Sequence, residues 1–554
     1  MLRLPRISKL LCVQSRSHNY GFQKDSRDLE RTSYLSQIEI HRDFFGYTSG
    51  RWLYNEQPQL EKRYVNFDVP TLQQAASHIV GSRCLQMTKL PEGLYNKVFS
   101  LEMENGREIL ARIPNPNAGH PQYVVASEVA TLDFLRNVLD IPVPEVLSWS
   151  SPSQHNAVGA EYILMERVRG RQLSEVWDAM SEAQRFGLVK SLVAIEQKLA
   201  NVKFALHGSL YYKDTYPHGR TIIDPTEPEQ ETGSNFVIGP ITQRSFWEDK
   251  KEELVIDRGP WETAEGYFTS IARREIALIR EMGPRRSNDT SALLGKTQLE
   301  RDMHVHLLEQ FQVLLPHLLP PKETLRPVLL HHDLHSDNIF VHSSDPTKIS
   351  AIIDWQAVYT APLFMQAKFP SIFDCDDDAY PWGAVRPNLP KDFDLLSQSE
   401  KEMAEARLGR LRLKKFYELA SRKFNPPLAK AMDAMRNDDD PTSFIFHMVG
   451  QSSQDGPIPL KELLIQIYEK WDQIMERRGL ALPCPISFSK EEIDRSRRQI
   501  KEWADLYGEF DRLRADIVGK DGWVSHDDYE EAKRRWENNR NHLDLLRERL
   551  EKLS

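Results

Sequence analysis

The residues best suited to chemistry are an aspartate, an asparagine five residues later, and a second aspartate farther along the chain. They are Asp333, Asn338 and Asp354. Phosphoryl transfer needs a carboxylate that orients the attacking hydroxyl and accepts its proton, and it needs hard oxygen ligands for the magnesium ion of the nucleotide. The pattern therefore predicts Asp333 as the catalytic base, and Asn338 and Asp354 as magnesium ligands.

Two short apolar runs are expected to bring these residues together. Ile339 to Val341 and Ile349 to Ile353 are joined by a six-residue turn from Ser343 to Lys348, so the pattern predicts a β-hairpin. In an antiparallel pair the start of the first strand lies beside the end of the second, which places Asn338 near Asp354. An Asp or an Asn beside a strand is commonly a turn former. The joint pattern of HxDxxxxN, strand, turn, strand and Asp is far more restrictive, and it contains the Asp-to-Asn spacing of the protein-kinase signature.

A small mixed lobe is expected upstream of these residues. Signals for β-structure begin at about residue 90: alternating apolar residues over 99–103, then Asn105-Gly106, then an apolar run over 109–113. This order is the strongest short-range signal for a hairpin. A helical repeat over residues 125–135 and a strand over 162–165 complete the lobe.

The remainder of the chain is predicted to be mainly helical. Helices are expected over 188–199 and 299–315, and residues 210–300 are interpreted as an insertion of loops and short helices. The predicted organisation is a presequence (1–35), an N-terminal extension (36–84), a nucleotide-binding N-lobe (85–168), a C-lobe with the insertion (169–485) and a charged helical tail (486–554).

The segment from His331 to Asn338 resembles the loop of aminoglycoside-phosphotransferase-family kinases, usually H-G-D-L-H-x-x-N followed by I-D-W or I-D-F. The residues that match are His331, Asp333, Leu334, His335, Asn338 and Ile353-Asp354-Trp355. His332 replaces the usual Gly, and Asp337 stands where Gly is frequent and adds negative charge beside the metal. The resemblance covers residues 85–480. More narrowly, a presequence followed by a long kinase-like body is similar to fungal mitochondrial members of this family.

This resemblance implies an α+β, two-lobed, protein-kinase-like fold that binds ATP and Mg²⁺, with a β-rich N-lobe and a larger, mainly helical C-lobe. The family's basic residue for the α- and β-phosphates falls on Arg112, and the Glu that holds it falls on Glu128. An arginine that merely faces solvent is the alternative for Arg112. The phosphate-covering loop falls on Pro91 to Lys97 with Gly93 and Asn96, although one glycine without GxGxxG is a weak signal. The hinge that receives adenine through backbone groups falls on Met165 and Glu166.

Composition limits the other possibilities. The net charge is −9 and no basic stripe is present, so a nucleic-acid surface is not expected. No apolar stretch is long enough for a transmembrane helix, and the four cysteines lack CxxC spacing. The first 24 residues are rich in Arg and Lys and contain no acid, which is typical of a mitochondrial presequence; a disordered basic terminus is the alternative.

Three functions fit these features. The first is a mitochondrial phosphotransferase that uses ATP and magnesium to phosphorylate a hydroxyl group of a small molecule. The second is an ATP-binding pseudokinase that serves as a regulator or scaffold in mitochondrial maintenance or inheritance. The third is a protein kinase, which the missing A-P-E after Asp354 disfavours. No protein partner is indicated.

Overall fold

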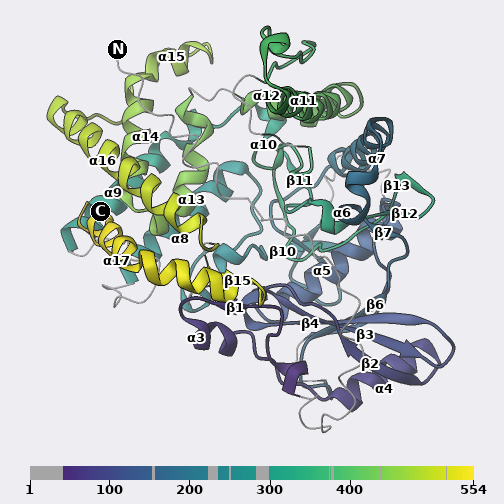
Figure 1. Cartoon of the computed structure of the whole chain (residues 1–554). Coiled ribbons are helices and arrows are strands. Elements are labelled where there is room, and N and C mark those ends of the chain that lie inside the picture. Colours follow the sequence, from purple (N-terminus) through teal and green to yellow (C-terminus); the bar gives the residue numbers. More distant parts are fainter. Residues whose placement is uncertain are drawn as a thin grey trace.

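The structure is a computed structural model that describes residues 42–151, 156–221, 235–248, 251–281, 298–373, 375, 380–436, 440–519 and 521–553. The predicted presequence lies outside the described residues. Figure 1 shows a strand-rich N-terminal lobe on one side and a larger group of helices on the other. The α+β, two-lobed fold that the sequence predicted is confirmed.

A five-stranded antiparallel sheet forms the N-terminal lobe, in the order β2-β3-β4-β6-β5. Its strands are β2 (Cys84–Lys89), β3 (Asn96–Met103), β4 (Glu108–Pro114), β5 (Val146–Ser150) and β6 (Tyr162–Glu166). The predicted hairpin is β3–β4, and Gly106 at its turn has a φ of 78°, a left-handed conformation that favours glycine. Strand β2, which the sequence did not predict, begins before residue 90.

The two faces of this sheet contact different helices. Alternate residues of β4, such as Ile109 and Ala111, are buried with Leu72 and Ala76 of α4 (Val69–Val80). Leu110, on the opposite face, packs near Val125 and Val129 of α5 (Tyr123–Asp133), which confirms the predicted helix. Because side chains alternate along a strand, Arg112 has the parity of Leu110 and points to the α5 side.

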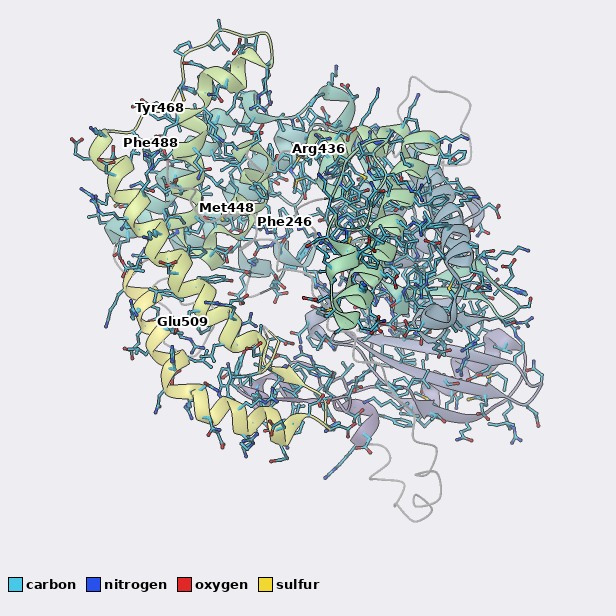
Figure 2. The ribbon with its side chains drawn as sticks, turned by 45° about the horizontal axis from the view of Figure 1, so that its top comes forward. Phe246, Arg436, Met448, Tyr468, Phe488 and Glu509 are labelled. Atoms are coloured by element: carbon cyan, nitrogen blue, oxygen red, sulfur yellow. The ribbon has the colours of Figure 1, made fainter. Side chains whose placement is uncertain are left out.

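Helices dominate the C-terminal lobe. They are α6 (Leu173–Val176), α7 (Glu182–Asn201), α8 (Ala264–Glu281), α9 (Gln298–Leu318), α10 (Leu363–Gln366), α11 (Gln398–Phe424), α12 (Pro426–Ala434), α13 (Ile445–Asp455), α14 (Pro457–Glu469) and α15 (Trp471–Glu476). Figure 2 shows Phe246 and Met448 inside this lobe, where both are fully buried. Phe268 and Phe446, with ring centroids 4.5 Å apart, join α8 to α13 in the same core.

Short strands carry the predicted site in the C-terminal lobe. The predicted hairpin is present as β12 (Ile339–His342) and β13 (Asp345–Ile352), and β7 (Arg171–Gln172) pairs with β12 on its other side. A two-stranded sheet of β11 (Pro327–Leu329) and β14 (Thr360–Pro362) lies before and after the hairpin in the chain. The predicted six-residue turn is wrong, because β13 begins at Asp345 and only Ser343 and Ser344 form the turn. Pro346 is tolerated because β13 is an edge strand.

The region predicted as loops and short helices contains regular structure instead. Strands β8 (Ser209–Tyr212), β9 (Arg220–Thr221) and β10 (Phe236–Gly239) form a three-stranded sheet, and α8 is 18 residues long. The prediction failed for α8 because the helix buries an ion pair. The guanidinium of Arg274 donates to Glu275 and to the carbonyl of Gly450, and Glu275 accepts from the amide of Ser453.

The predicted charged tail is helical. It contains α16 (Lys490–Ala515) and α17 (Tyr529–Leu553), and Leu546 and Leu550 of α17 are buried against Trp503 of α16. The short strand β15 (Trp523–Val524) between them pairs with β1 (Arg51–Trp52), near which α3 (Glu56–Glu61) begins. Within the described ranges, no helix combines the length and apolar character needed to cross a membrane.

Candidate active site

The hairpin brings the three residues predicted for phosphoryl transfer together. The amide of Ile353 donates to the carbonyl of Asn338 at 2.9 Å, so the residue before Asp354 lies directly against Asn338. The side-chain nitrogen of Asn338 lies 2.9 Å from the carbonyl oxygen of Asp333 and 3.0 Å from Nε2 of His335. One side chain therefore fixes the loop that carries Asp333. The Asp333 carboxylate itself remains exposed, at 76% of its side-chain surface.

His331 links the same loop to the turn that carries Asp354. Its Nε2 lies 2.9 Å from the carbonyl of Ile353, and its Nδ1 accepts from the amide of Asp333 at 3.2 Å. Its ring also lies edge-on to Trp355, with centroids 4.7 Å apart. Burial lowers the pKa of His331, which matches a neutral ring that donates through one nitrogen and accepts through the other.

The two departures from the family motif have separate structural roles. His332, in place of Gly, packs edge-on against Tyr359 and places Nε2 3.2 Å from Oε1 of Gln366; burial lowers its pKa to about 3. His332 is therefore neutral at physiological pH. Asp337 lies 3.4 Å from Nδ1 of His335, and this interaction raises the pKa of His335. The extra negative charge is thus directed to a histidine.

Asp354 adopts a left-handed backbone conformation, with a φ of 63°. A positive φ is uncommon outside glycine, and such residues cluster at functional sites. Its side chain is about half exposed, and Oδ1 lies 3.8 Å from a guanidinium nitrogen of Arg112. The carboxylate is therefore open on one side and faces a cation from the other lobe.

Arg112 forms an ion pair with Glu128 of α5. The Glu128 side chain is almost completely buried and that of Arg112 is 11% exposed, so the alternative of a solvent-facing arginine is wrong. Burial lowers the pKa of Arg112 to about 10, which leaves it cationic at neutral pH. Its Nε is buried without a hydrogen-bond partner. A buried donor without a partner is costly, and it suits a site that receives an anionic ligand.

The insertion holds the helix that carries Glu128. The hydroxyl of Tyr212 in β8 donates to Asp133 of α5 at 2.8 Å. Phe236 of β10 packs edge-on against Phe134, directly after α5, with ring centroids 5.4 Å apart. These contacts fix α5, and with it Glu128, against the C-terminal lobe.

The predicted phosphate-covering loop contacts the turn that carries Asp354. The side-chain amides of Asn96 and Gln356 form two hydrogen bonds, at 3.0 and 3.2 Å. A side chain at Gly93 would meet no atom within 4 Å, so the space above this glycine is open. Arg244 of the insertion lies over the ring of Tyr95, 3.6 Å from its centroid. The sequence did not predict Gln356 as a residue of the site. Its position two residues after Asp354 was the only sequence feature that pointed to it.

The same loop is anchored by a buried charge network that the sequence analysis missed. Glu92 binds Lys89 at 2.6 Å and Lys97 at 3.1 Å, and the side chains of Glu92 and Lys97 are fully buried. Burial lowers the pKa of Lys97 to about 8. The sequence did contain a signal for the burial of Lys97. Side chains alternate along a strand, so Lys97 points to the same side of β3 as Phe99 and Leu101, which is the core side.

The predicted hinge lies at the end of β6. Leu110 of β4 is the register partner of Met165, and Ile109 is that of Glu166. The amide of Glu166 donates to the carbonyl of Glu145 at 2.9 Å, and its carboxylate accepts from Arg136 at 3.0 Å. The amide of Glu166 is therefore already bonded within the protein.

The donor set around Asn338 fits a magnesium ion. Asn338 uses its side-chain nitrogen for the contacts described above, which leaves its amide oxygen as a ligand atom, and Asp354 offers an open carboxylate. Mg²⁺ prefers such hard oxygens and usually takes only one or two protein ligands together with water and substrate phosphates. In the described part of the chain, no group of three or more His, Cys, Asp or Glu side chains is arranged to hold a metal ion. With two protein oxygens, the candidate site is of the type that water and substrate phosphates complete.

A family model described as the phosphotransferase enzyme family, APH, matches residues 86–365. The chain belongs to this family. A subtelomeric hrmA-associated cluster protein of Aspergillus fumigatus is 32% identical over 483 residues, which cover 81% of this chain and 91% of that protein.

Proteins named for mitochondria are more distant relatives. "Altered inheritance of mitochondria protein 9, mitochondrial" of Yarrowia lipolytica is 23% identical over 542 residues, covering 90% of this chain and 88% of that one. Among solved structures, one from Ralstonia eutropha carries the name aminoglycoside phosphotransferase. The similarity covers 73% of this chain and 99% of that protein, at 14% sequence identity and a TM-score of 0.36. Membership of the phosphotransferase family rests on the sequence matches alone.

Proposed function

We propose that this chain is an ATP- and magnesium-dependent phosphotransferase that phosphorylates a hydroxyl group of a small molecule. The observation that carries the proposal is that one residue, Asn338, holds the loop of Asp333 and lies against the residue before Asp354. Its side chain binds the carbonyl of Asp333, and its own carbonyl accepts the amide of Ile353. Membership of the phosphotransferase family supports the same class of reaction.

Each residue has a proposed role that follows from its position. Asp333, exposed on its loop, orients the acceptor hydroxyl and takes its proton. Asn338 and Asp354 hold magnesium through oxygen atoms. Arg112, fixed by Glu128 and 3.8 Å from Asp354, binds phosphate oxygens. A guanidinium fork can serve a carboxylate and a phosphate together.

The adenine and phosphate contacts are also proposed from position. Gly93, in the loop before β3, and Asn96, at the start of β3, cover the phosphates, and the end of β6 at Met165 and Glu166 receives the base. Bound Mg²⁺–ATP would supply the phosphoryl group and neutralise its developing charge. The protein's own groups orient the acceptor and move its proton to Asp333.

We also place the protein in mitochondria. The basic, acid-free N-terminal segment and the names of the more distant relatives both support this location. Fluorescence imaging of the full chain fused at its C-terminus to a reporter, compared with a chain lacking residues 1–35, tests it. Identical distributions of the two fusions would contradict a presequence.

The decisive experiment is phosphorylation of an untargeted metabolite extract by the purified chain with Mg²⁺–ATP. We expect at least one product that is lost with Asp333→Asn and with Asp354→Asn. General-base catalysis typically contributes about 10²- to 10⁴-fold, so Asp333→Asn should lower the rate by that order. Asp345→Asn is the matched control, since Asp345 lies at the far end of the same hairpin.

The binding behaviour of the variants separates the enzyme from the pseudokinase. Asp333→Asn should still bind Mg²⁺–ATP with nearly the wild-type Kd, because Asp333 is not a proposed metal ligand. Tight Mg²⁺–ATP binding without any product from a broad metabolite panel would favour the scaffold role. Product formation that survives both substitutions would contradict the assigned site.

A further inference from the structure

The N-terminal extension and the C-terminal tail meet in the folded chain. Strand β1 pairs antiparallel with β15, with Trp52 opposite Trp523, and the amide of Leu53 donates to the carbonyl of Gly522 at 3.0 Å. Figure 1 shows β1 and β15 side by side, next to the N-terminal lobe. We call the contact between residues 48–54 and residues 522–536 the clasp.

Side chains on and next to the two strands build the clasp. Arg51 lies over the ring of Tyr529, 3.7 Å from its centroid, and Tyr54 packs on Trp536 with ring centroids 5.1 Å apart. Gly50 allows the close approach, since a Cβ there would lie 2.4 Å from Nε1 of Trp523. The tail is therefore docked through specific contacts.

The opposite side of the extension holds the predicted phosphate-covering loop. The amide of Thr48 donates to a carboxylate oxygen of Glu92 at 2.8 Å, and the amide of Glu92 donates to the hydroxyl of Ser49 at 2.8 Å. Lys89 and Lys97 each donate to the carbonyl of Gly46 at 2.8 Å while they bind Glu92. Glu92 is the residue directly before Gly93.

Thr48 joins the two contacts. Its carbonyl lies 3.0 Å from Nε2 of His526 in the tail, and its amide binds Glu92 in the loop. Displacement of the tail would therefore remove this partner of the Thr48 carbonyl, in the same residue whose amide binds Glu92. Glu92 is fully buried, so the loss of a donor such as the Thr48 amide would destabilise its carboxylate.

We propose that the C-terminal tail positions the phosphate-covering loop, so that docking of Trp523 and His526 on the extension sets the affinity of the protein for nucleotide phosphates. Trp523, His526 and Ser49 are positioning residues in this scheme, since they act through Glu92. The assignment of the loop to nucleotide phosphates rests on the proposed function. The mechanical link between the tail and the loop is independent of that function, because it depends only on the contacts described above.

Hydrogen–deuterium exchange of the full-length chain without nucleotide tests the mechanical link. We expect Trp523→Ala and His526→Ala to raise exchange of the amides of residues 93–98 about tenfold, with α5 unchanged. Ser49→Ala should raise the same exchange while residues 522–530 stay protected, because it removes only the bond to the amide of Glu92. Leu545→Ala, exposed on α17, is the control. Faster exchange of residues 522–530 with unchanged exchange of residues 93–98 would overturn the proposal.

Nucleotide binding tests the consequence. The loop is assigned to phosphates, so Trp523→Ala should raise the Kd of Mg²⁺–ATP about tenfold and change that of adenosine less than twofold. Equal weakening of both ligands would indicate general destabilisation and would overturn the positioning role. A wild-type chain that binds no Mg²⁺–ATP would contradict the proposed function. The exchange experiment would still show whether the tail positions the loop, because it is done without nucleotide. If Trp523→Ala does not fold, His526→Ala gives both readouts, since it removes only the contact of the tail with the Thr48 carbonyl.

Discussion

Asn96 and Gln356 form a reciprocal pair of amide hydrogen bonds, at 3.0 and 3.2 Å, between the two lobes. Asn96 belongs to the loop assigned to the phosphates and is the first residue of β3, and Gln356 follows Asp354 by two residues. The pair therefore joins the candidate phosphate site to the candidate magnesium site. Each amide satisfies the other.

The first prediction is that Mg²⁺–ATP competes with Gln356 for Asn96. Gln356→Ala should lower the stability of the unliganded protein by about 1–2 kcal/mol, since each hydrogen bond contributes about 1 kcal/mol. It should also tighten Mg²⁺–ATP binding several-fold, because Asn96 is released for the phosphates. Thermal unfolding and calorimetric titration measure the two effects. Asn96→Ala should cost the same stability but weaken binding, and a variant pair that changes binding in the same direction would contradict this competition.

The second prediction concerns the buried ion pair of Arg112 and Glu128. Arg112→Met leaves a nearly fully buried carboxylate without its partner, and breaking such a pair typically costs about 3–5 kcal/mol. Urea unfolding at pH 7 should show a loss of this order. The double variant Arg112→Met/Glu128→Met should recover most of it, since apolar replacements of a buried pair are often nearly neutral. A double variant as unstable as the single one would show that the pairing is not the cause.

The third prediction concerns metal dependence. If Asp354 and Asn338 hold magnesium, Asp354→Asn should raise the Mg²⁺ concentration needed for half-maximal ATP binding by at least tenfold. Asp345→Asn should leave it unchanged. The measurement is a Mg²⁺ titration at fixed ATP after removal of metal with EDTA. An unchanged midpoint for Asp354→Asn would remove this residue from the magnesium site.

The parts of the site that were predictable from sequence are those formed by neighbours in the chain. Asn338 precedes and Asp354 follows one hairpin, so a local pattern was sufficient to place them together at its open end. The turn was misplaced because Asp345 and Pro346 favour turns, whereas an edge strand accepts both. The helix α4 had signals that were not used, namely Asp68, which caps it by accepting from Thr71, and Gly81 at its end.

The parts that were not predictable depend on distant segments. Asn96 and Gln356 are separated by 260 positions, and β1 and β15 are strands of two residues each from opposite ends of the chain. Two residues carry no periodicity, so only the folded backbone reveals such pairs. Helix α8 was missed because its buried Arg274 and Glu275 look like surface residues until Ser453 and Gly450 satisfy them.

The fourth prediction concerns the titration of His335. Its ordinary pKa is 6.5, and the hydrogen bond with Asp337 raises the pKa in the folded protein. This interaction therefore stabilises the fold below pH 6.5 and is lost as the pH rises through the folded pKa. Asp337→Asn should lower the pKa of His335, as followed by the NMR shift of its ring proton. Its signal is assigned with His335→Gln, and an unchanged pKa would exclude Asp337 as the cause.

The last prediction concerns Glu196 of α7, which is buried and accepts a hydrogen bond from the hydroxyl of Tyr417 at 2.8 Å. Burial raises its pKa from 4.5 to about 8, so the folded state holds a proton that the unfolded state has lost at neutral pH. Stability must then fall as the pH rises from about 4.5 to about 8. Glu196→Gln keeps an acceptor for Tyr417 and removes this titration.

The variant should therefore be more stable than the wild type at neutral pH, by a margin that grows between pH 5 and pH 8. Thermal unfolding at several pH values in one mixed buffer measures the margin. Glu182→Gln, at the exposed start of the same helix, serves as the control and should show no such growth. A margin for Glu196→Gln that is constant with pH would mean that Glu196 is ionised in the folded protein.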